Sequence, residues 1–66
     1  MQIKKTNLEI AMGDKAVNFT ELSKLSKVSR QTLSYIYNGK ECTPVVAGKI
    51  ARALDVGISD LIEKEA

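Results

Sequence analysis

The sequence contains no histidine and no tryptophan, and it has a single cysteine, a single proline and only three aromatic residues. Zinc fingers, Cys-His nucleophiles and intramolecular disulfides are therefore excluded, and the sole thiol, Cys42, is interpreted as passive. No apolar run is long enough for a signal peptide or a membrane helix. We expect no metal, no cofactor, no small-molecule ligand and no membrane contact, and we expect a cytoplasmic protein.

A chain of 66 residues forms one domain at most and buries only about 60% of the surface that its unfolded form exposes. The hydrophobic share of 44%, with few aromatic residues, suits a compact bundle of short helices better than a β-sandwich. The sequence holds no set of acid, base and nucleophile, so an enzyme is rejected and no catalytic residues are expected.

The net charge of +2 is a weak argument for any partner, but the charges are unevenly distributed. Residues 1–40 carry seven Lys or Arg against three Asp or Glu, whereas residues 41–66 carry three against five. The first part of the chain is therefore expected to present a basic face.

Two pairs of residues have the spacing of a capping box, in which a side chain at each end bonds the other's backbone N–H. Thr6 with Glu9 predicts a first helix directly after Thr6, and Asn18 with Glu21 predicts a second helix that ends near Lys27. Ser29 is the expected cap of a third helix, whose inward positions are Leu33 and Ile36.

The second half of the chain has equally local signals. The dipeptide Asn38-Gly39 predicts the end of the third helix, and Thr43 before Pro44 predicts the start of a fourth that runs to about Leu54. A fifth helix is expected near residue 58, with a mostly acidic polar face made by Asp60, Glu63 and Glu65. The fold class is thus all-α, a compact bundle of about five short helices in one domain over residues 1–66.

Three apolar positions leave alternatives open. Leu25 lies off the main apolar stripe of its helix, so it packs under the first or fifth helix, which we favour, or forms part of a partner surface. Leu61 and Ile62 either cover the core or form a dimer seam.

Two short helices joined by a few residues, the second with polar groups in its first turn, have the geometry that places an α-helix in the major groove of DNA. Arg can bond guanine O6 and N7, and Gln can bond adenine N6 and N7; here these residues are Arg30 and Gln31. The segment of residues 18–38 is therefore a candidate helix-turn-helix. Solvated surface is the alternative reading for an arbitrary helix start.

The stretch FTELSKLSKVSRQTLSYIYNGK, residues 19–40, resembles the helix-turn-helix of the lambda repressor and Cro-like (XRE-type) family. The following KIARALDVGISDLI, residues 49–62, is similar to the last two helices of that family. The positions that carry the resemblance are Leu22, Ser23, Val28, Ser29, Leu33, Asn38 and Gly39.

The resemblance implies that Arg30, Gln31, Ser34 and Tyr35 face base edges and that Asn38, Gly39 and Lys40 meet the phosphate backbone. Because helix N-termini bind phosphate, we add residues at the starts of the third and fourth helices, Ser29, Thr32 and Thr43, to the phosphate set. The ring of Tyr35 could instead pack on a neighbour, and Tyr37 is interpreted as structural.

Three residues depart from the family pattern. Phe19 replaces a glutamine that touches phosphate in many members, so that contact is expected to be missing. Ser23 replaces the usual alanine at the helix crossing, and Lys27 replaces the turn glycine that commonly takes a left-handed conformation. A turn that is either strained or rearranged is expected at Lys27.

The sequence thus predicts a sequence-specific, double-stranded DNA-binding transcriptional regulator, a phage or mobile-element repressor of the Cro/repressor type. It would bind a roughly palindromic operator as a homodimer and act by occupying it. The alternative is a protein-interaction module on the same fold, an antirepressor or an antitoxin-like partner. A fragment of a longer repressor would have the same sequence features.

Overall fold

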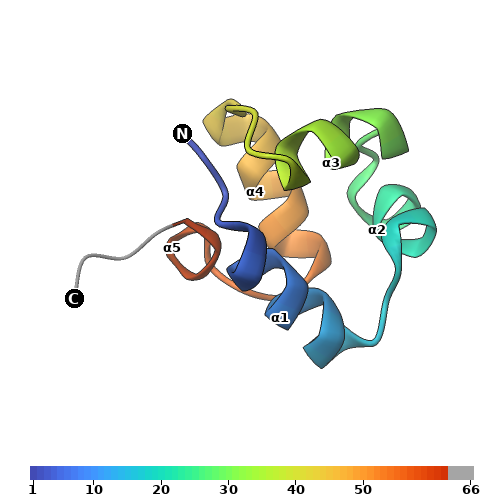
Figure 1. Cartoon of the computed structure of the whole chain (residues 1–66). Coiled ribbons are helices and arrows are strands. Elements are labelled where there is room, and N and C mark those ends of the chain that lie inside the picture. Colours follow the sequence, from blue (N-terminus) through green and yellow to red (C-terminus); the bar gives the residue numbers. More distant parts are fainter. Residues whose placement is uncertain (63–66) are drawn as a thin grey trace.

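The computed structural model of the protein describes residues 1–62 and consists of helices joined by short connections (Figure 1). The predicted all-α bundle of about five short helices is confirmed. Within the described residues the helices are α1 (Lys5–Lys15), α2 (Phe19–Ser26), α3 (Arg30–Tyr37), α4 (Pro44–Ala53) and α5 (Ile58–Leu61). The expected acidic positions Glu63 and Glu65 lie outside the residues that the structure describes.

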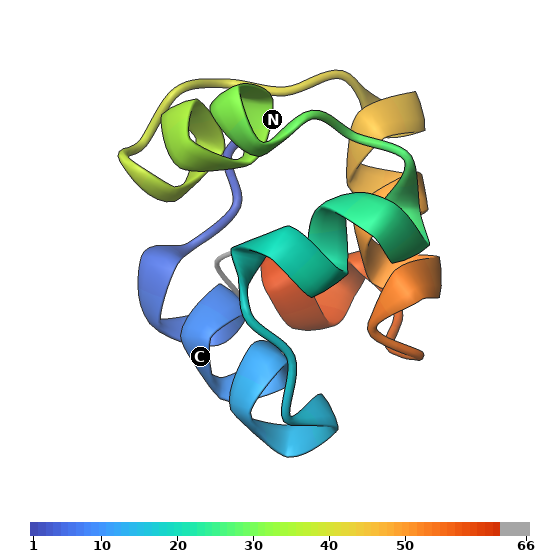
Figure 2. The same cartoon turned by 90° about the vertical axis from the view of Figure 1, so that its right-hand side faces the viewer.

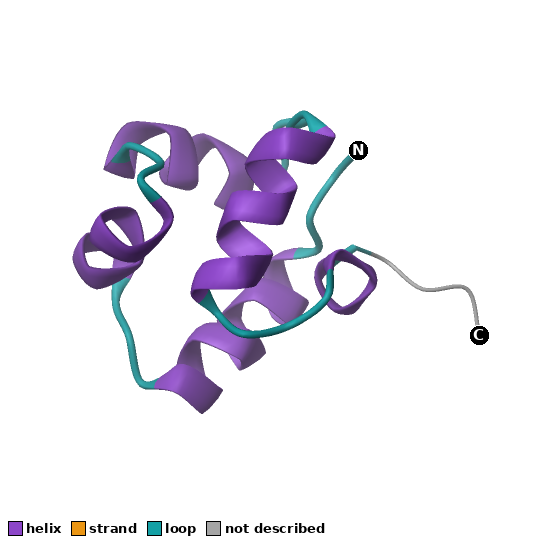
Figure 3. Ribbon diagram, turned by 180° about the vertical axis from the view of Figure 1, so that it is seen from behind, coloured by secondary structure: helices purple, strands orange, loops and turns teal. Residues whose placement is uncertain are grey.

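The helices wrap around one core, and α4 contacts both α2 and α5. Figure 2 shows α2 and α3 as two short helices joined by the loop of residues 27–29, with α1 below them. Seen from behind, α4 lies between the α2–α3 pair and α5 (Figure 3). This arrangement leaves one long side of α3 without a covering helix.

Each of the five helices contributes one large aliphatic side chain that is completely buried in the core. These side chains have no exposed surface, and they are Leu8, Leu22, Leu33, Ile50 and Leu61. Burying one such side chain stabilises the fold by about 1.5 to 3 kcal/mol relative to leaving it in water. Because Leu61 is buried and Ile62 is partly buried, the terminal helix α5 covers the core, one of the two roles considered for it.

Three of the four predicted N-caps are confirmed. Asn18 and Glu21 form a reciprocal capping box, with distances of 2.9 Å from Glu21 N to Asn18 Oδ1 and 3.0 Å from Asn18 N to Glu21 Oε1. Ser29 Oγ accepts from the backbone N–H of Thr32 at 3.1 Å. Thr43 Oγ1 accepts from the third residue of α4, Val46, at 3.3 Å. The starts of α2, α3 and α4 are thus determined locally.

The predicted capping box at Thr6 and Glu9 is wrong, because α1 begins earlier, at Lys5, with no side-chain cap. The chain before α1 is held by a distant segment: the backbone N–H of Lys4 donates to the carbonyl of Leu61 at 2.9 Å. Glu9 serves another partner, since its Oε2 accepts from the Tyr37 hydroxyl at 2.7 Å. Tertiary contacts therefore override the local start signal.

The turn between α2 and α3 contains the expected left-handed residue. Lys27 has φ 61° and ψ 26°, a region that costs a non-glycine residue about 1 to 2 kcal/mol. The buried Ser26 compensates within the turn: its hydroxyl donates to the Leu22 carbonyl at 2.7 Å and accepts from the Val28 N–H at 3.2 Å. The turn keeps its backbone groups bonded although it lacks the glycine.

Leu25 does not pack under a helix, contrary to the favoured expectation, and its side chain is 55% exposed. It projects from α2 towards the open space between α2 and α4. The side chain that faces it from α4 is the small Ala53, and the other neighbours in that space include the long cations Lys15 and Arg52. The core therefore offers Leu25 no apolar partner large enough to cover it.

The left-handed turn gives the first testable prediction. Lys27→Gly removes the steric penalty at φ 61° but increases the entropy of the unfolded chain, so we expect a net gain in the free energy of unfolding of about 0.5 to 1 kcal/mol. Thermal unfolding followed by circular dichroism measures it as a rise in Tm of roughly 2 to 8 °C.

The matched control is Lys24→Gly, which places the same substitution inside α2, where glycine costs about 1 kcal/mol. We expect the two variants to shift Tm in opposite directions. Equal losses of stability would show that Lys27 does not hold the left-handed conformation.

Candidate nucleic-acid interface

The outward side of α3 carries the four residues predicted to face base edges. The inward side is anchored by Leu33, which is fully buried, and Ile36, which is 2% exposed. On the other side the structure brings the four together, with Arg30, Gln31 and Tyr35 exposed and Ser34 half-buried. Because α3 has a period of about 3.6 residues, burying one side fixes the direction of the other.

Tyr35 is connected to two neighbouring polar residues. The Nε2 of Gln31 donates to the Tyr35 hydroxyl at 2.9 Å, and the Nζ of Lys40 lies 5.1 Å from the centroid of the Tyr35 ring. The ring therefore packs beside a cation, one of the two roles predicted for Tyr35, and the residue stays 49% exposed, so base contact remains a prediction. The spacing of four residues between Gln31 and Tyr35 is the signal in the sequence that could have indicated this hydrogen bond.

The start of α3 offers backbone donors. The Ser29 hydroxyl accepts from the N–H of Thr32 and donates to Thr32 Oγ1 at 2.8 Å. The backbone N–H groups of Arg30 and Gln31 have no hydrogen-bond partner within residues 1–62, as is usual in the first turn of a helix. Two amides and the positive end of the helix dipole therefore face outwards beside the two candidate base-reading side chains.

The loop after α3 uses most of its polar groups internally. Asn38 Nδ2 donates to the Ser34 carbonyl at 2.8 Å, and the N–H groups of Gly39 and Lys40 donate to carbonyls of α3 at 3.0 Å each. Gly39 has φ +99°, a conformation that disfavours any side chain. Of the three phosphate contacts predicted in this loop, Lys40 is the one with a charged side chain, and that side chain is exposed.

Residues 1 and 2 brace the same loop, which sequence reasoning missed. The backbone N–H of Cys42 donates to the carbonyl of Met1 at 2.8 Å, and the side-chain amide of Gln2 donates to the carbonyl of Gly39. Residues 1 and 42 are too far apart in sequence for any local pattern to indicate this pairing. The bracing holds Lys40 in place relative to α3.

A hollow of about 240 Å³ separates α3 from the start of α4. Four of the predicted site residues line it together: Thr32, Tyr35, Lys40 and Thr43. Arg30, Gln31 and Ser34 do not line this hollow. Burial raises the pKa of the Cys42 thiol, which also lines the hollow, so this thiol is less reactive than a free one, in line with its predicted passive role.

A comparison with known protein families identifies the family of this chain. Residues 7–66 match the family described as the Cro/C1-type HTH DNA-binding domain. The chain belongs to this family. Neither a search of curated proteins nor a search of solved structures found a significant match. The predicted resemblance to the lambda repressor and Cro-like family is therefore confirmed, and with it the assignment of a DNA-binding domain.

Phe19, the residue at the start of α2 that departs from the family pattern, belongs to an aromatic cluster in this Cro/C1-type domain. The rings of Phe19 and Tyr37 meet edge to face, with centroids 5.4 Å apart. The Nζ of Lys5 lies 4.5 Å from the centroid of the Tyr37 ring. Phe19 is half-buried and so braces α2 against the end of α3, a structural role that a glutamine could not fill in the same way.

The described residues were also compared with the requirements of a metal site and of a membrane-spanning helix. No three His, Cys, Asp or Glu side chains in residues 1–62 lie close enough together to hold a metal ion. Over the same residues, no helix combines the length and the apolar character needed to cross a lipid bilayer.

The hydrogen bond from Tyr37 to Glu9 makes stability depend on pH. The Glu9 carboxylate accepts a hydrogen bond from the Tyr37 hydroxyl, and this bond raises the pKa of the Tyr37 phenol above its ordinary value. Desolvation of the phenol and the negative charge of Glu9 raise the pKa further. A raised pKa in the folded state means that the stabilisation is complete below about pH 10 and is lost as the pH rises through the raised value.

We therefore expect Tyr37→Phe to melt below the unmodified chain at pH 7 and the difference to shrink above about pH 10. Thermal unfolding at a series of pH values measures it. Glu9→Gln is the matched control, because it removes the negative charge and should weaken the same pH dependence. A difference in Tm that stays constant from pH 7 to pH 11 would contradict the assignment.

Proposed function

We propose that this Cro/C1-type domain is a sequence-specific transcriptional regulator, a repressor of the phage or mobile-element type that acts by occupying its operator. The observation that carries the proposal is the exposure of Arg30 and Gln31 in the first turn of a helix whose opposite side is buried. Such side chains can read guanine and adenine edges in the major groove. No cofactor, small-molecule ligand or catalytic step is part of this mechanism.

Phosphate binding would position α3 on the duplex. The unpaired N–H groups in the first turn of α3 support this role, and the ammonium of Lys40 adds a positive charge beside Tyr35. The hydroxyls of Thr32 and Thr43 line the hollow between α3 and α4 together with Lys40. Asn38 and Gly39 act indirectly in this proposal, because their hydrogen-bonding donors close the end of α3.

Two copies are proposed to bind one operator. A single recognition helix contacts only a few base pairs, so one small domain gains limited specificity. A homodimer on a roughly palindromic site doubles the contact and fixes the spacing of the two half-sites. Its place of action is the cytoplasm, where the regulated DNA lies.

A protein-interaction module on the same fold remains the alternative function. A domain of that kind has no need for exposed bidentate side chains on α3. Here Arg30 and Gln31 are exposed, and Lys40 lies over Tyr35 at the edge of the same face. These groups favour DNA as the ligand of this face.

The two kinds of contact can be separated by mutation. Gln31→Ala should weaken binding to the preferred site by a factor of about 5 to 150 and leave binding to random duplex nearly unchanged. Lys40→Ala should weaken both by similar factors and reduce the slope of log K against log salt by about 0.9. Competition assays on the two duplexes over a range of salt concentrations measure both effects.

The control is Lys24→Ala, which removes an exposed lysine from α2 outside the proposed contact set. It should change neither the ratio of affinities nor the salt slope. Equal losses for Gln31→Ala on both duplexes would make Gln31 a backbone contact, and an absence of binding to any duplex at low salt would overturn the proposed function.

A further inference from the structure

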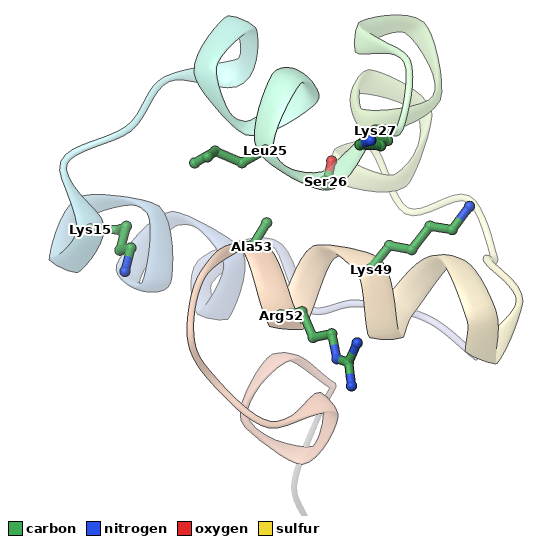
Figure 4. A pocket seen from close by; sticks show the side chains of 7 residues that line it. All are labelled: Lys15, Leu25, Ser26, Lys27, Lys49, Arg52 and Ala53. Carbon is green, nitrogen blue, oxygen red and sulfur yellow. The ribbon is translucent and has the colours of Figure 1, made fainter.

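A basic groove of about 490 Å³ lies between α2 and α4, on the side of the molecule where α1 ends (Figure 4). Leu25 borders it from α2, and Ala53 borders it from α4. Four cations complete its borders, one from the end of α1, one from the turn after α2 and two from α4: Lys15, Lys27, Lys49 and Arg52. The groove shares no lining residue with the proposed DNA-binding face.

The positive charge of the groove is not neutralised within the described chain. No Asp or Glu lines the groove, and within residues 1–62 none of the four cationic side chains makes an ion pair or a hydrogen bond. Lys15 and Arg52 lie in the last turns of their helices, where the helix dipole favours a cation. The dipole does not account for Lys49, which lies in the middle of α4. Like charges that gather without a counter-charge favour an anionic occupant.

The groove also has an apolar wall. The Leu25 side chain is 55% exposed there, and the half-buried Ala53 faces it from α4. An exposed leucine inside a ring of cations matches an occupant that offers both carboxylates and an aliphatic side chain. A phosphate backbone supplies the charge but no group that would cover Leu25.

We propose that the basic groove binds a partner protein through an acidic segment that carries an aliphatic side chain. The carboxylates of the segment pair with Lys27, Lys49 and Arg52, and its aliphatic side chain packs on Leu25. The proposed phosphate contacts of the Cro/C1-type domain lie at the N-terminal end of α3 and between Lys40 and the start of α4, whereas the groove lies at the C-terminal ends of α1 and α2 and along the second half of α4. The partner therefore binds without displacing DNA.

The test uses a 12-residue peptide in which two leucines are flanked by glutamates, and the same peptide with both leucines replaced by serine. Titration of the full ¹⁵N-labelled chain is followed by amide chemical shifts, with and without duplex DNA. We expect the leucine peptide to shift the amides of residues 15, 25, 27, 49, 52 and 53. Burial of one leucine should make it bind at least about tenfold tighter than the serine peptide, equally with DNA present.

Two variants with different effects on charge keep the result interpretable. Leu25→Ser keeps every charge and should abolish the difference between the two peptides. Arg52→Gln should weaken both peptides by about two- to fivefold, as expected for one exposed ion pair. Lys24→Gln, the control, removes an equal charge from α2 outside the groove and should leave both affinities unchanged.

Equal binding of the two peptides would reduce the effect to general attraction of anions and overturn the proposal, as would shifts located elsewhere on the chain. A loss of DNA affinity in Arg52→Gln, together with a flatter salt slope, would make duplex phosphate the occupant and also overturn it. Because the peptide titration works without DNA, its failure and the failure of the proposed function are distinguishable.

Discussion

The burial of Leu33 and Ile36 holds α3 against the rest of the bundle, and the outward side of that helix depends on it. A helix of eight residues has only two turns, so two buried side chains are enough to fix its rotation about its own axis. Removing a buried leucine from a core costs about 2 to 5 kcal/mol, a large part of the stability of so small a domain. Anchoring and recognition are thus two sides of the same short helix.

The connection between α2 and α3 determines how that helix is presented. The turn forces a left-handed conformation on Lys27, and the Ser26 hydroxyl satisfies the backbone on both sides of it. At the other end of α3, residues 1 and 2 hold the loop that carries Lys40. The candidate interface is therefore supported at both ends of α3 by residues outside the predicted contact set.

Local chemistry made much of this fold predictable from the sequence. The caps at Asn18, Ser29 and Thr43 each depend on residues no more than three positions apart, and all three are confirmed. The start of α1 could not be predicted in the same way. The residues before it pair with the segment at Leu61, which is distant in the sequence. Exposure of Leu25 was also missed, since the size of the side chain opposite it is a property of the packed bundle.

The candidate site was predicted as a set of residues, and the contacts among them were not. The grouping on one side of α3 follows from helical spacing, so the positions of Arg30 and Gln31 were predictable. The bond from Gln31 to Tyr35 and the placement of Lys40 over the Tyr35 ring depend on rotamers and on the course of the loop. Whether these side chains meet bases or phosphates stays a prediction.

Selection of bound sites from a random duplex library tests the central claim most directly, because it asks whether the exposed side of α3 reads base sequence. The account predicts enrichment of a two-fold symmetric site whose half-sites lie about 10 bp apart and contain guanine and adenine at adjacent positions. A library that remains random after repeated selection, or a lone asymmetric half-site at saturating protein, would contradict it.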